Sequence, residues 1–217
     1  LYLDGHTRVN TKVVDPGNGQ TTDINLPGTH LSAVQIEDQI GRLMGVLNAL
    51  SATARWVVLS GSLPPGWPMD TYATLTRHVH ALGGKVMLDT SGQPFTEALK
   101  ASPDMVKPNR DELAEHLGRP LKTVAEVVEA ARRLLNESHE MSLVAVSMGR
   151  DGAVFVSPSS AIVAHPLEVE LISSVGAGDA MVAGIVAAQL HALSLGECAQ
   201  LATAFAAGKL SRLGPHL

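Results

Sequence analysis

The feature that most constrains the fold is a repeated alternation of short apolar runs with longer segments of helical period. The runs are Trp56–Ser60, Lys85–Asp89, Met105–Val106 and Leu143–Ser147. This alternation predicts parallel strands joined by crossover helices that cover both faces of one sheet. In such sheets ligands bind beyond the carboxyl ends of the strands. We therefore expect an α/β fold with a mostly parallel sheet and a site at that edge.

Segments of helical period fill the intervals between these runs. The first begins at Ser32, where Gln35 completes the pattern of a capping box, and its apolar residues from Ile36 to Leu47 recur at helical spacing. Further helices are expected at residues 72–82, 94–100, 110–117, 124–135, 177–193 and 195–213.

Two stretches depart from the alternation. We interpret the short extended runs Ala153–Val156 and Ala161–Ala164 as an antiparallel addition to the sheet. Near the start, residues 6–14 and 21–26 flank the turn-rich sequence "DPGNG", which predicts a β-hairpin. We expect two parts: residues 1–28 as part of a β lid, and residues 29–217 as an incomplete α/β core.

Composition excludes several classes of protein. The net charge of −5 is mild and no basic stripe is present, which argues against nucleic acid as the main partner. No apolar run is long enough to span a bilayer, so we expect no membrane partner. The single cysteine, Cys198, cannot form an intrachain disulfide and fits a reducing compartment, the cytoplasm. The nine histidines show no zinc-binding spacing.

The stretch "VGAGDAMVAG" at residues 175–184 is the richest in chemistry. It fails the dinucleotide fingerprint because Met181 stands where the third glycine is required, and a P-loop ending at Lys209 fails because Thr203 replaces its first glycine. What remains is a glycine-rich helix start with Asp179 in its first turn. Such a start attracts an anion, and the carboxylate can accept a proton from an attacking hydroxyl. The alternative is that Asp179 is only a favourable charge at a helix N-terminus.

A second segment, "KPNRDE" at residues 107–112, also allows two interpretations. Asn109 can cap the following helix with Glu112 as its partner three residues later. Alternatively, both side chains organise water around a phosphate-bound Mg²⁺, which keeps several waters and uses few carboxylates. The segments "SGSLPPG" and "SMGRDG", at residues 60–66 and 147–152, are either tight turns or ligand contacts.

Taken together and in this order, the four segments resemble the ribokinase-like (PfkB) family of sugar kinases. The resemblance implies a three-layer α/β/α fold with a small β lid and transfer of phosphate from ATP with Mg²⁺. Asp179 would be the base, and the N–H groups of Gly176, Ala177 and Gly178 would form an anion hole.

The same resemblance assigns the binding residues. Lys107 and Asn109 would contact the ATP phosphates, and Glu112 would hold Mg²⁺ mostly through water with help from Asp89. The nucleotide would be lined by Ser147 and by Gly149 to Gly152, and the phosphate of the sugar would be bound by Arg8 and Ser62.

The opening segment "GHTRVNTKVVDPGNGQTTDINLPG" resembles the lid hairpin of the branch that phosphorylates sugar phosphates. Within that branch it is most similar to the kinases of fructose 1-phosphate; kinases of fructose 6-phosphate or tagatose 6-phosphate are the alternative. Two other classes remain, a non-catalytic sugar- or nucleotide-binding relative and an NAD-binding Rossmann protein, which the failed fingerprint disfavours. The free edge of the lid also suggests a homodimer.

The chain departs from the family pattern at both ends. It opens on "LYLDGHTRVN" without methionine, and the upstream strand, sugar-binding loop and last helix of the family have no counterpart in it. We therefore expect a fragment whose sugar site is incomplete.

Overall fold

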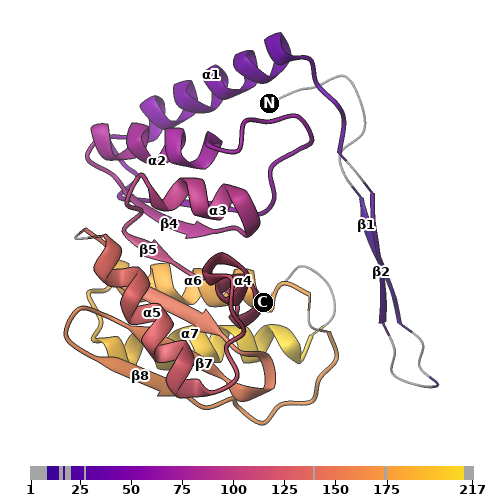
Figure 1. Ribbon diagram of the computed structural model, residues 1–217, viewed down its shortest axis with the longest axis vertical. Helices are drawn as coiled ribbons and strands as arrows, with labels where there is room; N and C mark the ends of the chain where they lie inside the picture. The colour runs from indigo at the N-terminus through magenta and orange to yellow at the C-terminus, as the bar shows by residue number, and fades with distance from the viewer. Residues whose placement is uncertain are drawn as a thin grey trace.

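The computed structural model describes residues 9–14, 17, 21–26, 28–138, 140–173 and 175–212. Its centre is a six-stranded sheet whose strands lie side by side in chain order (Figure 1). β3 to β6 pair in parallel, and β7 and β8 are added antiparallel. The predicted parallel strands and the predicted antiparallel addition are both confirmed. The strands are β3 (Trp56–Ser60), β4 (Lys85–Asp89), β5 (Met105–Val106), β6 (Leu143–Ser147), β7 (Ala153–Val156) and β8 (Ala161–Ala164).

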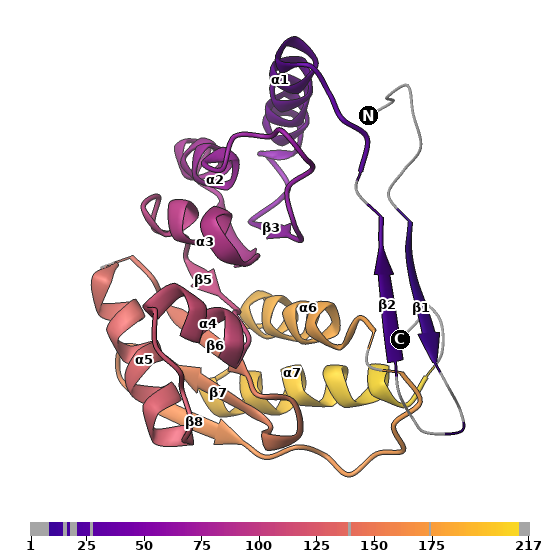
Figure 2. The same ribbon diagram turned by 45° about the vertical axis from the view of Figure 1, so that its right-hand side comes forward.

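Helices cover both faces of this sheet, as a three-layer α/β/α fold requires. One face is covered by α2 (Thr71–Ala81), α3 (Gly92–Leu99), α4 (Arg110–Leu117) and α5 (Val124–Glu137), with α1 (Ala33–Leu50) packed beside them. The opposite face is covered by α6 (Ala177–Leu190) and α7 (Leu195–Leu210). Figure 2 shows α6 and α7 on one side of the sheet and α4 and α5 on the other.

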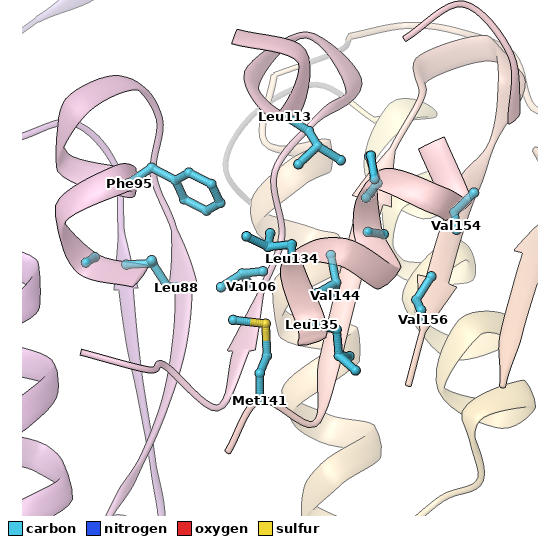
Figure 3. Packing of buried hydrophobic residues seen from close by; sticks show 14 of the residues in the cluster. Leu88, Phe95, Val106, Leu113, Leu134, Leu135, Met141, Val144, Val154 and Val156 are labelled. Atoms are coloured by element: carbon cyan, nitrogen blue, oxygen red, sulfur yellow. The ribbon is translucent and has the colours of Figure 1, made fainter. Parts of the chain in front are cut away.

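Strand alternation divides the apolar core between the two faces. Val86 and Leu88 point toward α2 and α3, whereas Met87 between them points toward α6 and α7. All three side chains are fully buried. Figure 3 shows the larger cluster, in which Phe95 of α3 and Leu134 of α5 close over the strands. Burial of such side chains contributes about 1.5–3 kcal/mol each, so this core holds the strand ends in place.

Helix starts follow from local sequence. α1, α4, α5 and α7 each open with a capping box, in which the N-cap side chain and the third helical residue satisfy each other's N–H groups. The box predicted for Ser32 and Gln35 is confirmed.

Some predicted helix ends are wrong by a few residues. α3 begins at Gly92 rather than at residue 94, and α5 continues to Glu137 rather than ending at residue 135. α6 ends at Leu190 rather than at residue 193, because the chain turns at His191 and at Ala192, whose φ is 51°. α7 is capped at Ser211, before the predicted end at residue 213.

The predicted hairpin consists of β1 (Asn10–Val14) and β2 (Thr21–Asn25), an antiparallel pair in register from Asn10 opposite Asn25. It forms a two-stranded sheet of its own, separate from the six-stranded sheet. Figures 1 and 2 show it standing apart from the α/β layers. Val13 and Ile24 leave about half of their surface exposed, at 51% and 48%.

Cys198 of α7 is buried in the core cluster between the sheet and the helices α6 and α7, and burial raises the pKa of its thiol to about 11. Within the described residues, every helix is too short or too polar to span a bilayer.

Candidate active site

The carboxyl ends of the parallel strands bring together residues from separate motifs. Asp89 ends β4, and Lys107 directly follows β5, where its N–H donates to the Leu88 carbonyl. The Lys107 ammonium lies 3.0 Å from Asp89 Oδ1, and the two side chains are only 5% and 15% exposed. This is a largely buried ion pair at the edge of the sheet that the sequence predicts to bind ligand.

The charges around Asp89 oppose one another. Burial raises the pKa of the Asp89 carboxyl, the ammonium of Lys107 lowers it, and the negative charge of Asp179 raises it again. The net direction is upward. Asp179 therefore lies near enough to Asp89 for its charge to be felt, although the two residues are 90 positions apart.

The N-terminus of α6 is built differently from the other helix starts in this fold. Gly176, at the N-cap, is in the left-handed region with φ 80° and has no side chain with which to cap the helix. The first N–H groups of a helix have no partner within it, so this turn presents donors toward an anion. A Cβ on Gly178 would lie 3.5 Å from the Lys107 ammonium, and Asp179 is exposed in the same turn. The predicted anion hole thus lies beside the buried ion pair.

The segment from Lys107 to Glu112 forms a complete capping box at the start of α4. Asn109 Oδ1 accepts from the Glu112 N–H at 2.8 Å, and Glu112 Oε2 accepts from the Asn109 N–H at 2.8 Å. The capping interpretation of this pair is therefore correct. It occupies only one carboxylate oxygen of Glu112, and the ATP and metal roles of Asn109 and Glu112 stay predictions.

A cavity of about 550 Å³ lies next to the anion hole. Its polar wall contains the predicted nucleotide residues Ser147, Gly149 and Gly152, and it reaches Ala177 and Gly178. A Cβ on Gly152 would lie 2.1 Å from the Ala164 carbonyl oxygen, so only glycine allows the chain to pass there. The wall also contains Arg150, which lies in the predicted segment from Gly149 to Gly152. The remaining wall is apolar and was not predicted from the sequence: Pro166, Leu167, Val169, Leu171, Met181, Ala206 and Leu210.

Two contacts hold the nucleotide segment against α4. The Ser147 N–H donates to the Pro108 carbonyl at 3.2 Å, and Arg110 forms an ion pair with Asp151. The short 3₁₀ turn η1 (Gly149–Asp151) is therefore fixed relative to the start of α4. The ion pair between Arg110 and Asp151 was not predicted, because it joins two segments that meet only in the folded chain.

Of the two residues predicted to bind sugar phosphate, only Ser62 lies in the part of the chain that the structure describes. Ser62 is exposed in the loop after β3, and this loop is attached to β4 because the Gly61 N–H donates to the Asp89 carbonyl at 2.9 Å. The Thr90 hydroxyl also donates to the Gly61 carbonyl, at 2.8 Å. Arg8 lies outside the described residues. The Ser62 loop is thus next to the Asp89 edge, whereas the position of Arg8 carries no structural argument.

The donor groups at this edge are compatible with a magnesium ion carried by phosphate. The described residues contain no cluster of three or more Asp, Glu, His or Cys side chains that could hold a metal alone. Mg²⁺ at nucleotide sites commonly uses one or two carboxylates together with phosphate oxygens and water. The free oxygen of Glu112 and the Asp89 carboxylate fit that role better than that of a permanent metal site.

Comparison with known proteins shows what kind of fold and site this is. The model of the pfkB family carbohydrate kinases matches residues 1–216, nearly the entire chain. The chain belongs to the pfkB family of carbohydrate kinases. The motifs at Asn109 and Gly176 to Asp179 therefore lie in a family of kinases, and the predicted family is confirmed.

Within the pfkB family, the chain is similar to 1-phosphofructokinases. The chain is 46% identical over 215 residues to a 1-phosphofructokinase of Rhodobacter capsulatus, covering 99% of this chain and 66% of the relative. It is 44% identical over 211 residues to a 1-phosphofructokinase of Xanthomonas campestris, covering 95% of this chain and 64% of the relative. The chain thus spans slightly less than two thirds of the length of these curated relatives.

The solved structures agree on the fold. Phosphofructokinase-2 of Escherichia coli, crystallised with substrates and products, superimposes with a TM-score of 0.84 at 28% identity. The superposition covers 93% of this chain and 64% of that enzyme. The ribokinase-like three-layer fold predicted from the sequence is confirmed.

Proposed function

We propose that this chain belongs to an enzyme that transfers the γ-phosphoryl group of ATP to fructose 1-phosphate, giving fructose 1,6-bisphosphate and ADP. The observation that carries the proposal is the exposed carboxylate of Asp179 in the first turn of a helix that starts at glycine. The similarity to 1-phosphofructokinases at 46% and 44% identity supports fructose 1-phosphate as the acceptor.

Asp179 acts as the base in this proposal. Its carboxylate takes the proton of the sugar hydroxyl while the hydroxyl oxygen bonds to the γ-phosphorus of ATP. The bond between that phosphorus and the bridging oxygen breaks, and ADP leaves with the electron pair. Phosphoryl transfer needs positioning and charge stabilisation more than covalent chemistry from the protein, which fits a site made largely of backbone N–H groups.

The N–H groups of Ala177 and Gly178 and the turn at Gly176 stabilise the charge on the transferred group. The Lys107 ammonium contributes positive charge beside Gly178, and the Asp89 carboxylate keeps that ammonium in position. Asn109 contacts the ATP phosphates.

We assign the nucleotide to the cavity of about 550 Å³ beside the anion hole. The apolar side chains of Leu167, Val169 and Leu171 suit an adenine base, and Ser147 and Gly149 to Gly152 suit the ribose and the phosphates. Mg²⁺, held through water by Glu112 with help from Asp89, would neutralise charge on the phosphates.

The sugar is assigned to the Asp89 edge of the sheet, next to which the Ser62 loop lies. Ser62 and Arg8 would bind its existing phosphate. The hairpin of β1 and β2 serves as the lid, residues 1–28, over an α/β core that begins at residue 29. We also propose that two copies pair through exposed lid residues such as Val13 and Ile24, as a homodimer in the cytoplasm. Light scattering that finds only monomer at high protein concentration would exclude this pairing.

A second acceptor is favoured by a separate observation. Phosphofructokinase-2 of Escherichia coli in complex with fructose 6-phosphate superimposes with a TM-score of 0.82. This makes fructose 6-phosphate, or the related tagatose 6-phosphate, the runner-up. The choice between these acceptors depends on groups that bind the sugar, and Arg8 is among them.

The test uses the enzyme that contains this chain, with a panel of fructose 1-phosphate, fructose 6-phosphate and tagatose 6-phosphate in the presence of ATP and Mg²⁺, and it measures the release of ADP. We expect the highest kcat/KM with fructose 1-phosphate. A preference for a 6-phosphate would select the runner-up. ATP binding by calorimetry is measured in parallel, because binding without turnover on any sugar would indicate a non-catalytic relative.

A further inference from the structure

We propose that Lys209, a residue outside the predicted site, is a positioning residue for the transferred phosphoryl group. Its stem supports the N-cap of α6, and its ammonium adds buried positive charge beside the anion hole. This inference rests on the proposed kinase function, and it assigns a role to the C-terminal turn of α7.

The first observation is burial. Lys209 is only 6% exposed, although lysine is rarely buried at all and most lysine side chains extend into water. It lies in the last turn of α7, where a cation is favoured by the helix dipole. The side chain therefore turns inward from the end of α7 rather than into water.

The second observation is that the aliphatic part of the Lys209 side chain lies against Gly176. A Cβ placed on Gly176 would lie 3.0 Å from Lys209 Cε, 3.8 Å from Cγ and 3.9 Å from Cδ. The stem thus lies along the backbone of the left-handed N-cap. Because the ammonium nitrogen is bonded to Cε by a bond of about 1.5 Å, it lies no more than about 4.5 Å from the same point. Positive charge is therefore held at the helix end that receives the phosphate.

The third observation ties the same turn of α7 to the strand-to-helix loop. The carbonyl of Leu210, next to Lys209, accepts the N–H of Ile172 at 2.9 Å and that of Ser173 at 3.1 Å. Carbonyls in the last turn of a helix have no partner within that helix, so here they fix the loop that leads into α6. Movement of the α7 end would therefore move Gly176.

Lys209 and Lys107 approach the same turn from different elements. Lys107 lies by Gly178 and is neutralised by Asp89, whereas Lys209 lies by Gly176 at the N-cap. The phosphate site would thus combine two lysines that are carried by different elements. An anion that binds the turn interacts with both ammonium groups and with the N–H groups of the helix.

The experiment compares Lys209→Met with the native chain. Methionine keeps most of the stem and removes the charge, so the fold should be retained. We expect the affinity for ATP, measured by calorimetry, to fall about tenfold, while the affinity for adenosine changes less than twofold. Phosphoryl transfer should slow by about tenfold to a hundredfold, less than or similar to the loss of one donor from an anion hole. Lys100→Met, at an exposed lysine of the α3 C-cap, is the matched control and should change neither affinity.

A second variant distinguishes the loss of positive charge from a folding defect. Lys209→Ala leaves space for a small amine, and ethylammonium should restore part of the ATP affinity if the missing charge is the cause. Equal losses of ATP and adenosine affinity in Lys209→Met would overturn the proposal, because they indicate a purely structural role. Unchanged ATP affinity would overturn it as well. The enzyme that contains this chain is assayed in parallel: if it binds ATP but phosphorylates no sugar, the kinase function is refuted and the binding comparison stays valid.

Discussion

The helices α4 and α6 both start beside the same sheet edge with an acidic residue in their first turn, yet they are built in opposite ways. At α4, Asn109 and Glu112 satisfy each other's N–H groups. At α6, Gly176 offers no side chain, and the carboxylate of Asp179 is exposed. The first helix start is capped by its own side chains, whereas no side chain caps the second. An acidic residue near a helix start therefore has little meaning until the partners of the N–H groups are known.

The largest effect should come from Asp179→Asn. If Asp179 accepts the hydroxyl proton, kcat should fall by about 10²–10⁴-fold with little change in ATP affinity. Asp111→Asn is the matched control, since Asp111 is an exposed acid in the first turn of α4. Steady-state kinetics and calorimetry on both variants measure the contrast. Equal turnover by the two variants would contradict a special role for the α6 acid.

Lys107→Met should have an effect of similar size, but on the free energy of unfolding rather than on kcat. It leaves the Asp89 carboxylate buried without its ammonium, and breaking a buried pair costs about 3–5 kcal/mol. The double variant Asp89→Asn with Lys107→Met should be less destabilised than the single variant, because no unpaired charge remains. Urea unfolding measures both. A single variant as stable as the native chain would show that the pair contributes nothing.

Gly178→Ala should change stability and ATP affinity in opposite directions. The added methyl would lie 3.5 Å from the Lys107 ammonium, an ordinary contact, and Gly178 does not have a positive φ. The free energy of unfolding should therefore rise by about 0.4–1 kcal/mol, while the methyl obstructs the phosphate and lowers ATP affinity about tenfold. Gly45→Ala in α1, which meets open space, should give the stability gain alone.

Glu112→Gln separates capping from metal binding at α4. Glutamine keeps the capping box but loses the charge, so stability should change by less than about 0.5 kcal/mol. If Glu112 also holds Mg²⁺, the concentration of Mg²⁺ for half-maximal rate should rise several-fold. Glu126→Gln, at the equivalent position of the α5 box, is the control. An unchanged Mg²⁺ requirement would leave Glu112 with the cap alone.

The smallest expected effect is a pH dependence shared by the capped helices. Hydrogen bonds from the backbone of Thr123 and Lys122 lower the pKa of Glu126, and the Ser194 hydroxyl and backbone lower the pKa of Glu197. A lowered folded-state pKa gives stability that is present above the usual glutamate pKa, about 4.3, and is lost as pH falls through the lowered value. The difference in Tm between the native chain and Glu126→Gln should therefore narrow as the pH decreases below that range. A difference independent of pH would contradict the charged cap.

Sequence reasoning succeeded where the signal was local or periodic. Strand positions, the antiparallel addition and the α4 cap follow from the spacing of apolar residues and from Asn109 and Glu112 themselves. The roles of Gly176 to Asp179 come from the family resemblance and stay predictions. The Asp89–Lys107 pair, the Arg110–Asp151 clamp and the contact of Lys209 with Gly176 were not predicted, because each joins elements whose distance only the packed sheet defines. The apolar wall at Leu167 to Leu171 lies in a loop, where hydrophobic spacing has no fixed structural meaning.

The glycine start of α6 has a consequence for the amount of folded protein. A helix whose cap is supplied by a bound phosphate is finished only when its ligand is present, so ligand adds to the free energy of unfolding by mass action. At a ligand concentration one hundred times Kd this contribution is about 2.7 kcal/mol. If the phosphate is that of ATP, a fall in the cellular ATP concentration would remove this contribution and increase the unfolded fraction, which is the form that proteases degrade.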